Sequence, residues 1–254
     1  MDSSERTYTL PGFDGAPLAV HEVGEENGRP LLLWHGLFSS AYVNWIKYGH
    51  AATLAEGGYR VIMPDLRVHG LSAAPHEPEA YPDHVLVRDG LALLDELGLE
   101  DFDLGGFSLG ARTSAALLAA GVRPRKAILA GMGLGGLGHW SKRRKYFLEA
   151  IARRDTVTRD DPHFMSVMFM KTMKIDPVAA ELLLRSDADL DMHALRKVDL
   201  PIAVICGDED SDNGSAPDLA KALHDAHYIE IPGSHMSCIV KPDLGRAMLH
   251  FLNA

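Results

Sequence analysis

The chain has 254 residues, 46% of them hydrophobic and 24% charged, which is an ordinary composition for a globular protein with one sizeable core. Its formal charge of −10 argues against nucleic acid or an anionic membrane as a partner, because phosphate binding requires clustered positive charge. No signal-peptide pattern and no run of about 18 apolar residues is found, so we expect a cytoplasmic protein that does not cross a membrane. The two cysteines are too few for a disulfide framework.

The amino-terminal segment predicts a hairpin, because strand-like residues 8–10 and 18–21 flank the turn Gly12-Phe13-Asp14-Gly15. Short apolar strand candidates then alternate with helical stretches. Continuous apolar runs indicate strands buried on both faces, so we predict an α/β fold with a mostly parallel central sheet and helices on both faces. The strand candidates are 31–34, 61–63, 102–105, 127–130, 202–206 and 228–231, and the helix candidates outside the long insertion are 43–56, 82–97, 109–120, 217–224 and 242–252.

A long interval between the strand candidates 127–130 and 202–206 predicts an insertion. Helix starts are indicated inside it by Asp161-Pro162, by Asp176-Pro177 and by Ser141 as a cap. We interpret residues 134–197 as a helical lid on a single domain that spans residues 1–254.

The segment Gly106-Phe107-Ser108-Leu109-Gly110 carries the most specific chemical signal. It follows a strand candidate and leads into a helix of small residues, which is the setting of a nucleophile elbow. A Gly-rich turn without catalytic function is the alternative interpretation of the same residues. Glycines on either side of Ser108 allow a tight turn that exposes its hydroxyl near a helix N-terminus. Ser108 is therefore the candidate nucleophile.

A general base and an acid follow at the ends of the last two strand candidates. His235 lies directly after residues 228–231, and the acidic segment Gly207-Asp208-Glu209-Asp210 follows residues 202–206. Loops at the carboxyl ends of parallel strands carry the chemistry of such sheets. The resulting chain order Ser, Asp, His is that of α/β-hydrolases.

The sequence resembles the α/β-hydrolase fold family over almost its full length. The departures are Val68, where the family usually has glycine, and Phe38, where many members have proline. The motifs that carry the resemblance, in the family's order, are His35-Gly36-Leu37-Phe38, the segment 65–72, the elbow, the acidic loop 207–210 and the histidine loop 233–235.

By this resemblance Ser108, Asp210 and His235 form a catalytic triad, and the backbone N–H groups of Leu37 and Leu109 form the oxyanion hole. Asp210 is preferred as the acid because it is the third residue after Gly207, and Asp208 is the alternative. His35 and His69 are interpreted as hydrogen-bonding the backbone of the family loops.

No cofactor or metal is expected. An EF-hand loop starting at Asp208 would need glycine at Asn213 and glutamate at Leu219, so the acidic loop is interpreted as a solvated one. Candidate substrate contacts are apolar, and a plain packing helix is the alternative interpretation for those in the insertion. These contacts are Phe38, Phe107, Met165, Met168 and Phe169.

We expect structural roles for two sets of basic residues. The stripe Lys142-Arg143-Arg144-Lys145 is interpreted as a solvated helix face, with attraction of an anionic substrate as the alternative. Arg112, in the first turn after the elbow, is interpreted as a tether between loops.

These patterns together predict a serine hydrolase that cleaves a carboxylic ester of a small or medium, apolar substrate through an acyl-enzyme. A C–C bond hydrolase of the same fold, or a relative that binds a small ligand without catalysis, is the alternative. Dehalogenases and epoxide hydrolases of this fold use an aspartate nucleophile, where this chain has Ser108. The sequence does not indicate an oligomeric state.

Overall fold

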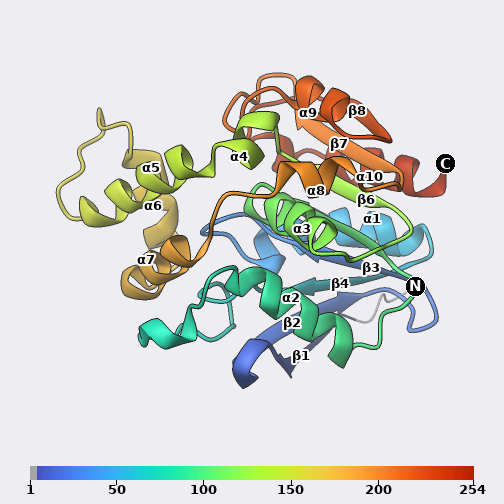
Figure 1. The fold of residues 1–254 in the computed structure, drawn as a ribbon, viewed down its shortest axis with the longest axis horizontal. Helices are drawn as coiled ribbons and strands as arrows, with labels where there is room; N and C mark the ends of the chain where they lie inside the picture. Colours follow the sequence, from blue (N-terminus) through green and yellow to red (C-terminus); the bar gives the residue numbers. More distant parts are fainter. Residues whose placement is uncertain (1–4) are drawn as a thin grey trace.

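The computed structural model describes residues 5–254 and contains an eight-stranded sheet with the strand order β1-β2-β4-β3-β5-β6-β7-β8 (Figure 1). Strands β1 and β2 form the predicted hairpin, β2 runs antiparallel to β4, and all other neighbours are parallel. The strands are β1 Arg6–Pro11, β2 Pro17–Val23, β3 Arg29–Trp34, β4 Tyr59–Pro64, β5 Asp103–Phe107, β6 Ala127–Ala130, β7 Ile202–Gly207 and β8 Ala226–Ile231.

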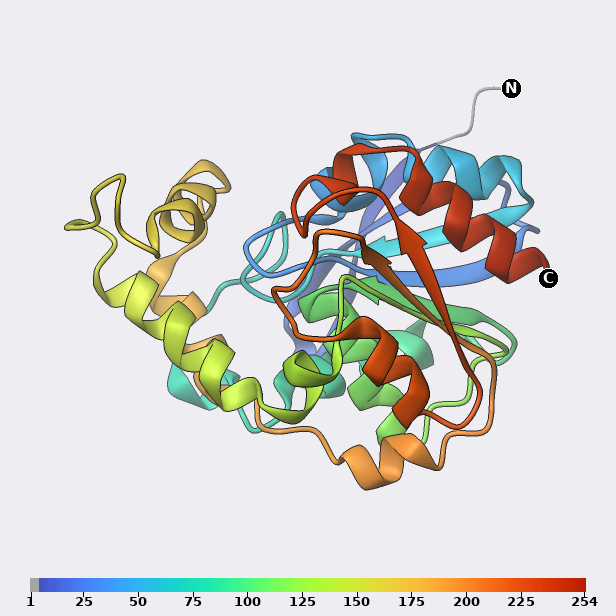
Figure 2. The same cartoon turned by 90° about the horizontal axis from the view of Figure 1, so that it is seen from above.

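Helices cover both faces of this sheet. Helices α1 (His50–Glu56) and α10 (Asp243–Asn253) pack on one face, and the other face is covered by α2 (Val85–Glu96), α3 (Leu109–Ala119), α8 (Met192–Arg196) and α9 (Ala216–Ala222) (Figures 1 and 2). The predicted α/β architecture is therefore confirmed.

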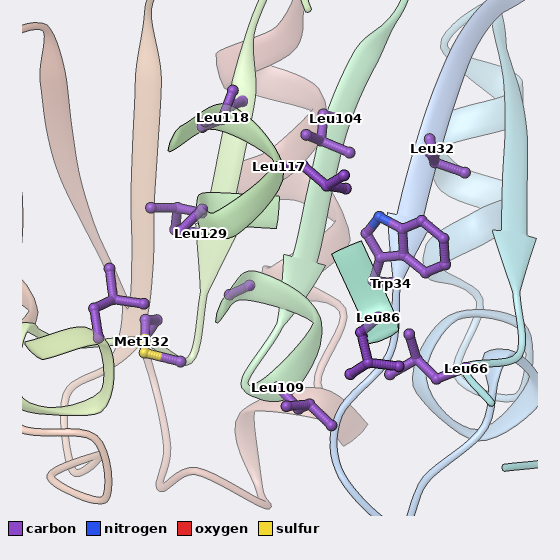
Figure 3. Packing of buried hydrophobic residues seen from close by; sticks show 14 of the residues in the cluster. Leu32, Trp34, Leu66, Leu86, Leu104, Leu109, Leu117, Leu118, Leu129 and Met132 are labelled. Carbon is purple, nitrogen blue, oxygen red and sulfur yellow. The ribbon is translucent and has the colours of Figure 1, made fainter. Parts of the chain in front are cut away.

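Strand residues alternate between two apolar cores. In β3, Leu32 and Trp34 face the core under α2 and α3, while Leu31 and Leu33 face the core under α1 and α10. Figure 3 shows Leu32 and Trp34 of the first core together with Leu104 of β5 and Leu117 of α3. The period-two pattern is why the strand sequences read as unbroken apolar runs: each successive side chain enters an opposite core.

Two of the predicted helix boundaries are wrong, and both errors lie at left-handed backbone. The helix expected at 43–56 is a π-helix, Tyr42–Ile46, followed by α1, and the break contains Gly49 at φ 81°. The helix expected from residue 82 begins only at Val85, because His84 has φ 60° and cannot be part of a right-handed turn.

Between β6 and β7 the chain forms α4 (Leu134–Gly138), α5 (Trp140–Ala152), α6 (Phe164–Thr172), α7 (Pro177–Ser186) and α8. Figure 2 shows α5 and α6 projecting beyond the body that the sheet and its covering helices form. Asp176 caps α7 as predicted, accepting hydrogen bonds from the amides of Val178 and Ala179. The other two predicted starts are wrong.

Those two errors have local causes. Ser141 lies inside α5, which already begins at Trp140. Asp161 instead accepts hydrogen bonds from the amides of His163 and Phe164, in the turn that precedes α6. Among residues 5–254, no helix combines the length and the apolar character needed to span a bilayer.

Candidate active site

Ser108 lies at the turn between β5 and α3 in a strained backbone conformation, with φ 54° and ψ −112°. The two elbow glycines permit this turn. A Cβ at Gly106 would collide with the backbone of Gly110, and a Cβ at Gly110 would collide with the carbonyl of Trp34. The Ser108 amide donates to the carbonyl of Ala130 at 2.9 Å, which fixes the elbow to β6. The sequence therefore specifies this geometry through close backbone packing.

The structure brings Ser108, His235 and Asp210 together in one hydrogen-bonded chain. His235 Nε2 lies 3.1 Å from Ser108 Oγ, and His235 Nδ1 lies 2.8 Å from Asp210 Oδ2. A carboxylate only accepts hydrogen bonds, so the imidazole proton resides on Nδ1. Nε2 is then free to accept the Ser108 proton.

Asp210 is buried, and its carboxylate is nevertheless held in the ionised form. Burial alone would raise its pKa, but hydrogen bonding to His235, the charge interaction with that imidazole and a bond from the Asp212 amide together lower it. The ring of Phe107 lies against His235, with centroids 4.9 Å apart. The imidazole is thus held between a carboxylate on one edge and an aromatic face.

The acidic loop and the histidine loop are clamped to each other by their backbones. The Asp208 amide donates to the Ile231 carbonyl at 2.8 Å, and Asp208 Oδ1 accepts from the Gly233 amide at 2.7 Å. A Cβ at Gly207 would collide with the carbonyl of Gly233. Asp208, the alternative acid, therefore holds the histidine loop, and Asp210 faces the imidazole.

His35 and His69 bond the backbone, as predicted, and tie two family loops together. His35 Nε2 accepts from the Leu66 amide and His69 Nε2 from the Phe38 amide, each at 2.9 Å. Their Nδ1 atoms donate to the carbonyls of Gly36 and Arg67, so both rings are neutral. Burial, followed by the nearby His35, lowers the pKa of His69 to about 3.

Two backbone N–H groups beside Ser108 remain unused. Within residues 5–254, the amides of Leu37 and Leu109 donate to no protein acceptor. The preceding amide, that of Gly36, is held at 3.1 Å by Asn44 Oδ1, and Asn44 is a buried residue of the π-helix. Two free donors next to a nucleophile can stabilise an oxyanion.

Two cavities meet at Ser108 and His235. The smaller one, about 130 Å³, lies under the π-helix and is lined by Asn44, Phe107 and Ile239 among others. The larger one, about 450 Å³, lies under α5 and α6. Leu37, Phe169 and Met236 contribute to both cavities.

All of the predicted apolar contacts reach one of these cavities. Phe107 lines the smaller cavity, Phe38, Met165 and Met168 line the larger one, and Phe169 lines both. Helix α6 also packs, because Val167 and Met170 on its other side are buried. Helix α6 therefore packs on the fold and also lines the cavity beside Ser108, while its contact with a substrate stays a prediction.

Several other residues that line the cavities are not predicted from the sequence. No sequence motif indicates a cavity position for these residues, which are Asn44, Tyr48, Tyr146, Phe147 and Met236. In the basic stripe, Lys142 and Lys145 are exposed as predicted, but the prediction is wrong for Arg143, which lines the larger cavity.

Arg112 is a tether, as predicted. Its guanidinium donates to Asp187 Oδ2 at 2.9 Å, to the carbonyls of Leu137 and Ala188, and lies over the ring of Trp140. These contacts fix both ends of the insertion to the helix that follows Ser108.

Comparison with known proteins agrees with this architecture. The family model described as "alpha/beta hydrolase fold" matches residues 29–166, more than half of the chain. With the Ser-Asp-His order and the strand order described above, the protein belongs to the α/β-hydrolase fold family.

Curated relatives match only part of their own length. The chain is 38% identical over 94 residues to epoxide hydrolase A of Mycobacterium tuberculosis, a match that covers 37% of this chain and 28% of that relative.

Solved structures match nearly the whole chain at low identity. An enol-lactonase from Burkholderia xenovorans LB400 superposes with a TM-score of 0.74 at 23% identity, covering 97% of this chain and 100% of the other. An esterase from Exiguobacterium antarcticum gives a TM-score of 0.79 at 16% identity, covering 98% and 100%. At such identities these similarities define the fold alone.

Proposed function

We propose that the protein is a serine hydrolase that cleaves carboxylic esters through an acyl-enzyme. The observation that carries the proposal is the hydrogen-bonded chain from Asp210 through His235 to Ser108, placed beside the free amides of Leu37 and Leu109. A hydroxyl with a base, an orienting acid and two oxyanion donors is the set of groups that acyl transfer requires.

The proposed reaction uses each group in turn. Ser108 Oγ attacks the ester carbonyl while His235 Nε2 takes its proton, and Asp210 stabilises the imidazolium that forms. The amides of Leu37 and Leu109 bind the oxyanion, a contribution worth about 10²- to 10³-fold in rate for each donor. The imidazolium then protonates the leaving alcohol, and a water molecule activated by His235 releases the acid.

We further propose that residues 134–197 act as a lid on a single catalytic domain. Helices α5 and α6 supply much of the wall of the larger cavity, and Met165 and Met168 of α6 remain exposed. Flexible thioether side chains adapt to ligands of different shape. Such walls suit a small or medium substrate with an apolar body.

Hydrolysis of p-nitrophenyl esters from acetyl to palmitoyl tests the proposal. We expect turnover with a chain-length optimum and a loss of at least about 10⁴-fold in kcat for Ser108→Ala. Ser141→Ala, an exposed serine on α5, is the matched control and should keep full activity. A fluorophosphonate should label Ser108 and no other residue, as read by peptide mass.

Full ester turnover by a pure Ser108→Ala preparation would overturn the mechanism. Absence of turnover on every ester would favour either C–C bond cleavage or ligand binding without catalysis. In the second case, a ligand would raise the thermal stability of the protein and no product would form.

Epoxide hydrolysis is the second candidate, favoured by the name of the Mycobacterium tuberculosis relative. By the family resemblance that reaction uses a carboxylate nucleophile, and position 108 carries a hydroxyl instead. Styrene oxide therefore belongs in the substrate panel, and its Ser108-dependent opening would favour this candidate over the esterase.

A further inference from the structure

Arg143, in α5, lines the larger cavity, which Ser108 and His235 also line. Among the described residues that line the two cavities around Ser108, Arg143 is the one arginine or lysine. About three quarters of its side chain is buried, since its exposed fraction is 24%. A charge in this position acts on whatever occupies the cavity.

Packing holds the guanidinium of Arg143 in place, and no hydrogen-bond partner for it lies in the part of the chain that the structure describes. Its centre lies 5.1 Å from the ring centroid of Phe147, and that ring in turn meets Phe38 edge-on at 5.7 Å. Within the described residues, Arg143 donates no hydrogen bond, and its Nε atom is fully buried. Aromatic packing thus holds the plane of a group whose N–H donors are unused.

Arg144, the next residue of the same helix, differs from Arg143 because its side chain has a structural hydrogen bond. Arg144 donates to the carbonyl of Asp187 at 2.9 Å, which fixes α5 to the segment after α7. Within residues 5–254, the one ion pair of Arg143 is a weak contact, 3.9 Å from its Nη2 atom to Asp212 Oδ2, and the Asp212 side chain is 51% exposed. That contact neutralises part of the charge but is too long for a hydrogen bond, so the N–H donors of the guanidinium are not used by Asp212.

A buried donor without a partner is unfavourable, and a ligand that supplies an acceptor removes this cost. The planar guanidinium matches a carboxylate in a two-point contact. A single cation with Asp212 nearby suits a monoanion better than a phosphate dianion. Met165, Met168 and Phe169 give the same cavity an apolar part of its wall, which would hold the body of the molecule.

We propose that Arg143 is an anion-recognition residue, and that the substrate is an ester or lactone whose apolar body carries a carboxylate away from the scissile carbonyl. This inference rests on the proposed ester hydrolysis and adds the substrate class to it. Asp212 competes with the substrate carboxylate for the same guanidinium.

The test compares charged and neutral members of matched ester pairs. One series is the monoethyl and diethyl esters of dicarboxylic acids from succinic to sebacic; the other is acetate esters of ω-hydroxy acids and of the corresponding alkanols. The two series place the carboxylate on the acyl or on the alcohol side. Acid release gives kcat/KM for each compound.

We expect a preference for the carboxylate-bearing member of at least about tenfold in one series, with an optimum chain length. Arg143→Met should abolish this preference while changing kcat/KM for neutral esters less than about threefold. Lys142→Met, which removes a charge from an exposed position of the same helix, should keep the preference. Asp212→Asn should increase it.

Equal turnover of charged and neutral esters by the wild-type protein would overturn the inference, as would equal losses for Arg143→Met and Lys142→Met. Absence of Ser108-dependent turnover would instead refute the proposed ester hydrolysis. A binding measurement then tests the role of Arg143 independently of turnover. Free adipate and suberate should raise the Tm of the wild type and leave the Tm of Arg143→Met unchanged. No shift for either protein would also overturn the inference.

Discussion

The two halves of the candidate site are built in different ways. The strand-end half, with Ser108, His235 and the loop that starts at His35, is largely buried and is fixed by backbone hydrogen bonds and by glycines in close contact. The insertion half consists of side chains on α5 and α6, of which Met165 is 73% exposed and Met168 is 42% exposed. The proposed reacting groups are therefore held by several restraints each, while the proposed substrate-facing wall includes exposed side chains.

This difference has a physical reason. The proposed acyl transfer would lose rate steeply if the reacting atoms moved by an ångström, which agrees with the several restraints on each of those atoms. Substrate selection needs only complementary surface, which a few side chains on a helix can provide. Changes in the strand-end half should cost rate or stability, and changes in the insertion half should alter substrate preference.

Asp210→Asn should give the largest effect in the strand-end half. The amide would stabilise neither the Nδ1–H tautomer nor the imidazolium, and we expect kcat to fall by about 10⁴-fold. Asp208→Asn is the matched control, because Asp208 bonds the Gly233 amide and not the imidazole. Steady-state ester hydrolysis measures both variants. A larger loss for Asp208→Asn would reassign the acid.

Gly110→Ala should destabilise the fold by about 3 kcal/mol or more, because its Cβ would meet the carbonyl of Trp34. Gly138→Ala in α4 is the control, since a Cβ there meets no atom within 4 Å. Urea unfolding gives the free energy of unfolding of each variant. If the two variants were equally stable, close packing at the elbow would not restrain Ser108.

Acidification should weaken the loop network around His69. Its pKa is lowered to about 3 in the folded protein, against about 6.5 in the unfolded chain, so between these values the unfolded chain binds more protons. The stabilising contribution is complete above pH 6.5 and is lost as the pH falls, by about 2 kcal/mol between pH 7 and pH 5.

His69→Gln should remove this part of the pH dependence, because glutamine binds no proton and can still accept from the Phe38 amide. Urea unfolding at pH 7, 6 and 5 measures the slope. His227→Gln, at a surface histidine, should unfold with the wild-type slope. Identical slopes for His69→Gln and the wild type would show that His69 titrates normally.

Val68 tests backbone strain in the same loop region. It is a buried β-branched residue at φ 78°, in the position where the family resemblance implies glycine. Val68→Gly and Val68→Ala lose similar packing, but only glycine relieves the left-handed strain, so Val68→Gly should be more stable than Val68→Ala by about 1 kcal/mol. Thermal unfolding of the pair decides the order, and the reverse order would exclude strain.

The double change Met165→Ser and Met168→Ser should have the smallest effect. Both side chains are exposed, so we expect the free energy of unfolding to change by about 0.5 kcal/mol or less. For octanoyl and longer esters KM should rise by about threefold to fivefold, because apolar wall area is lost. A large loss of stability would show that α6 is part of the rigid half.

The sequence by itself determined the parts of the protein that local backbone chemistry specifies. Glycines at 106 and 110 imply a tight strand-to-helix turn, and the order of Ser108, Asp210 and His235 implies the topology that brings them together. The alternation of β3 between two cores follows from its unbroken apolar run. Spacing from Gly207 also separated Asp210 from Asp208, whose side chain holds the adjacent loop.

Only the tertiary structure decided which side chains face the cavities. Four consecutive basic residues, 142–145, look alike in sequence. Packing of α5 against α6 and α7 nevertheless leaves Lys142 exposed and Arg143 mostly buried, over the ring of Phe147 one turn along the same helix. Asn44, which accepts from the Gly36 amide, lies in a π-helix where the sequence predicts part of an α-helix. Helix rotation and helix type depend on contacts between residues distant in sequence, which no local pattern encodes.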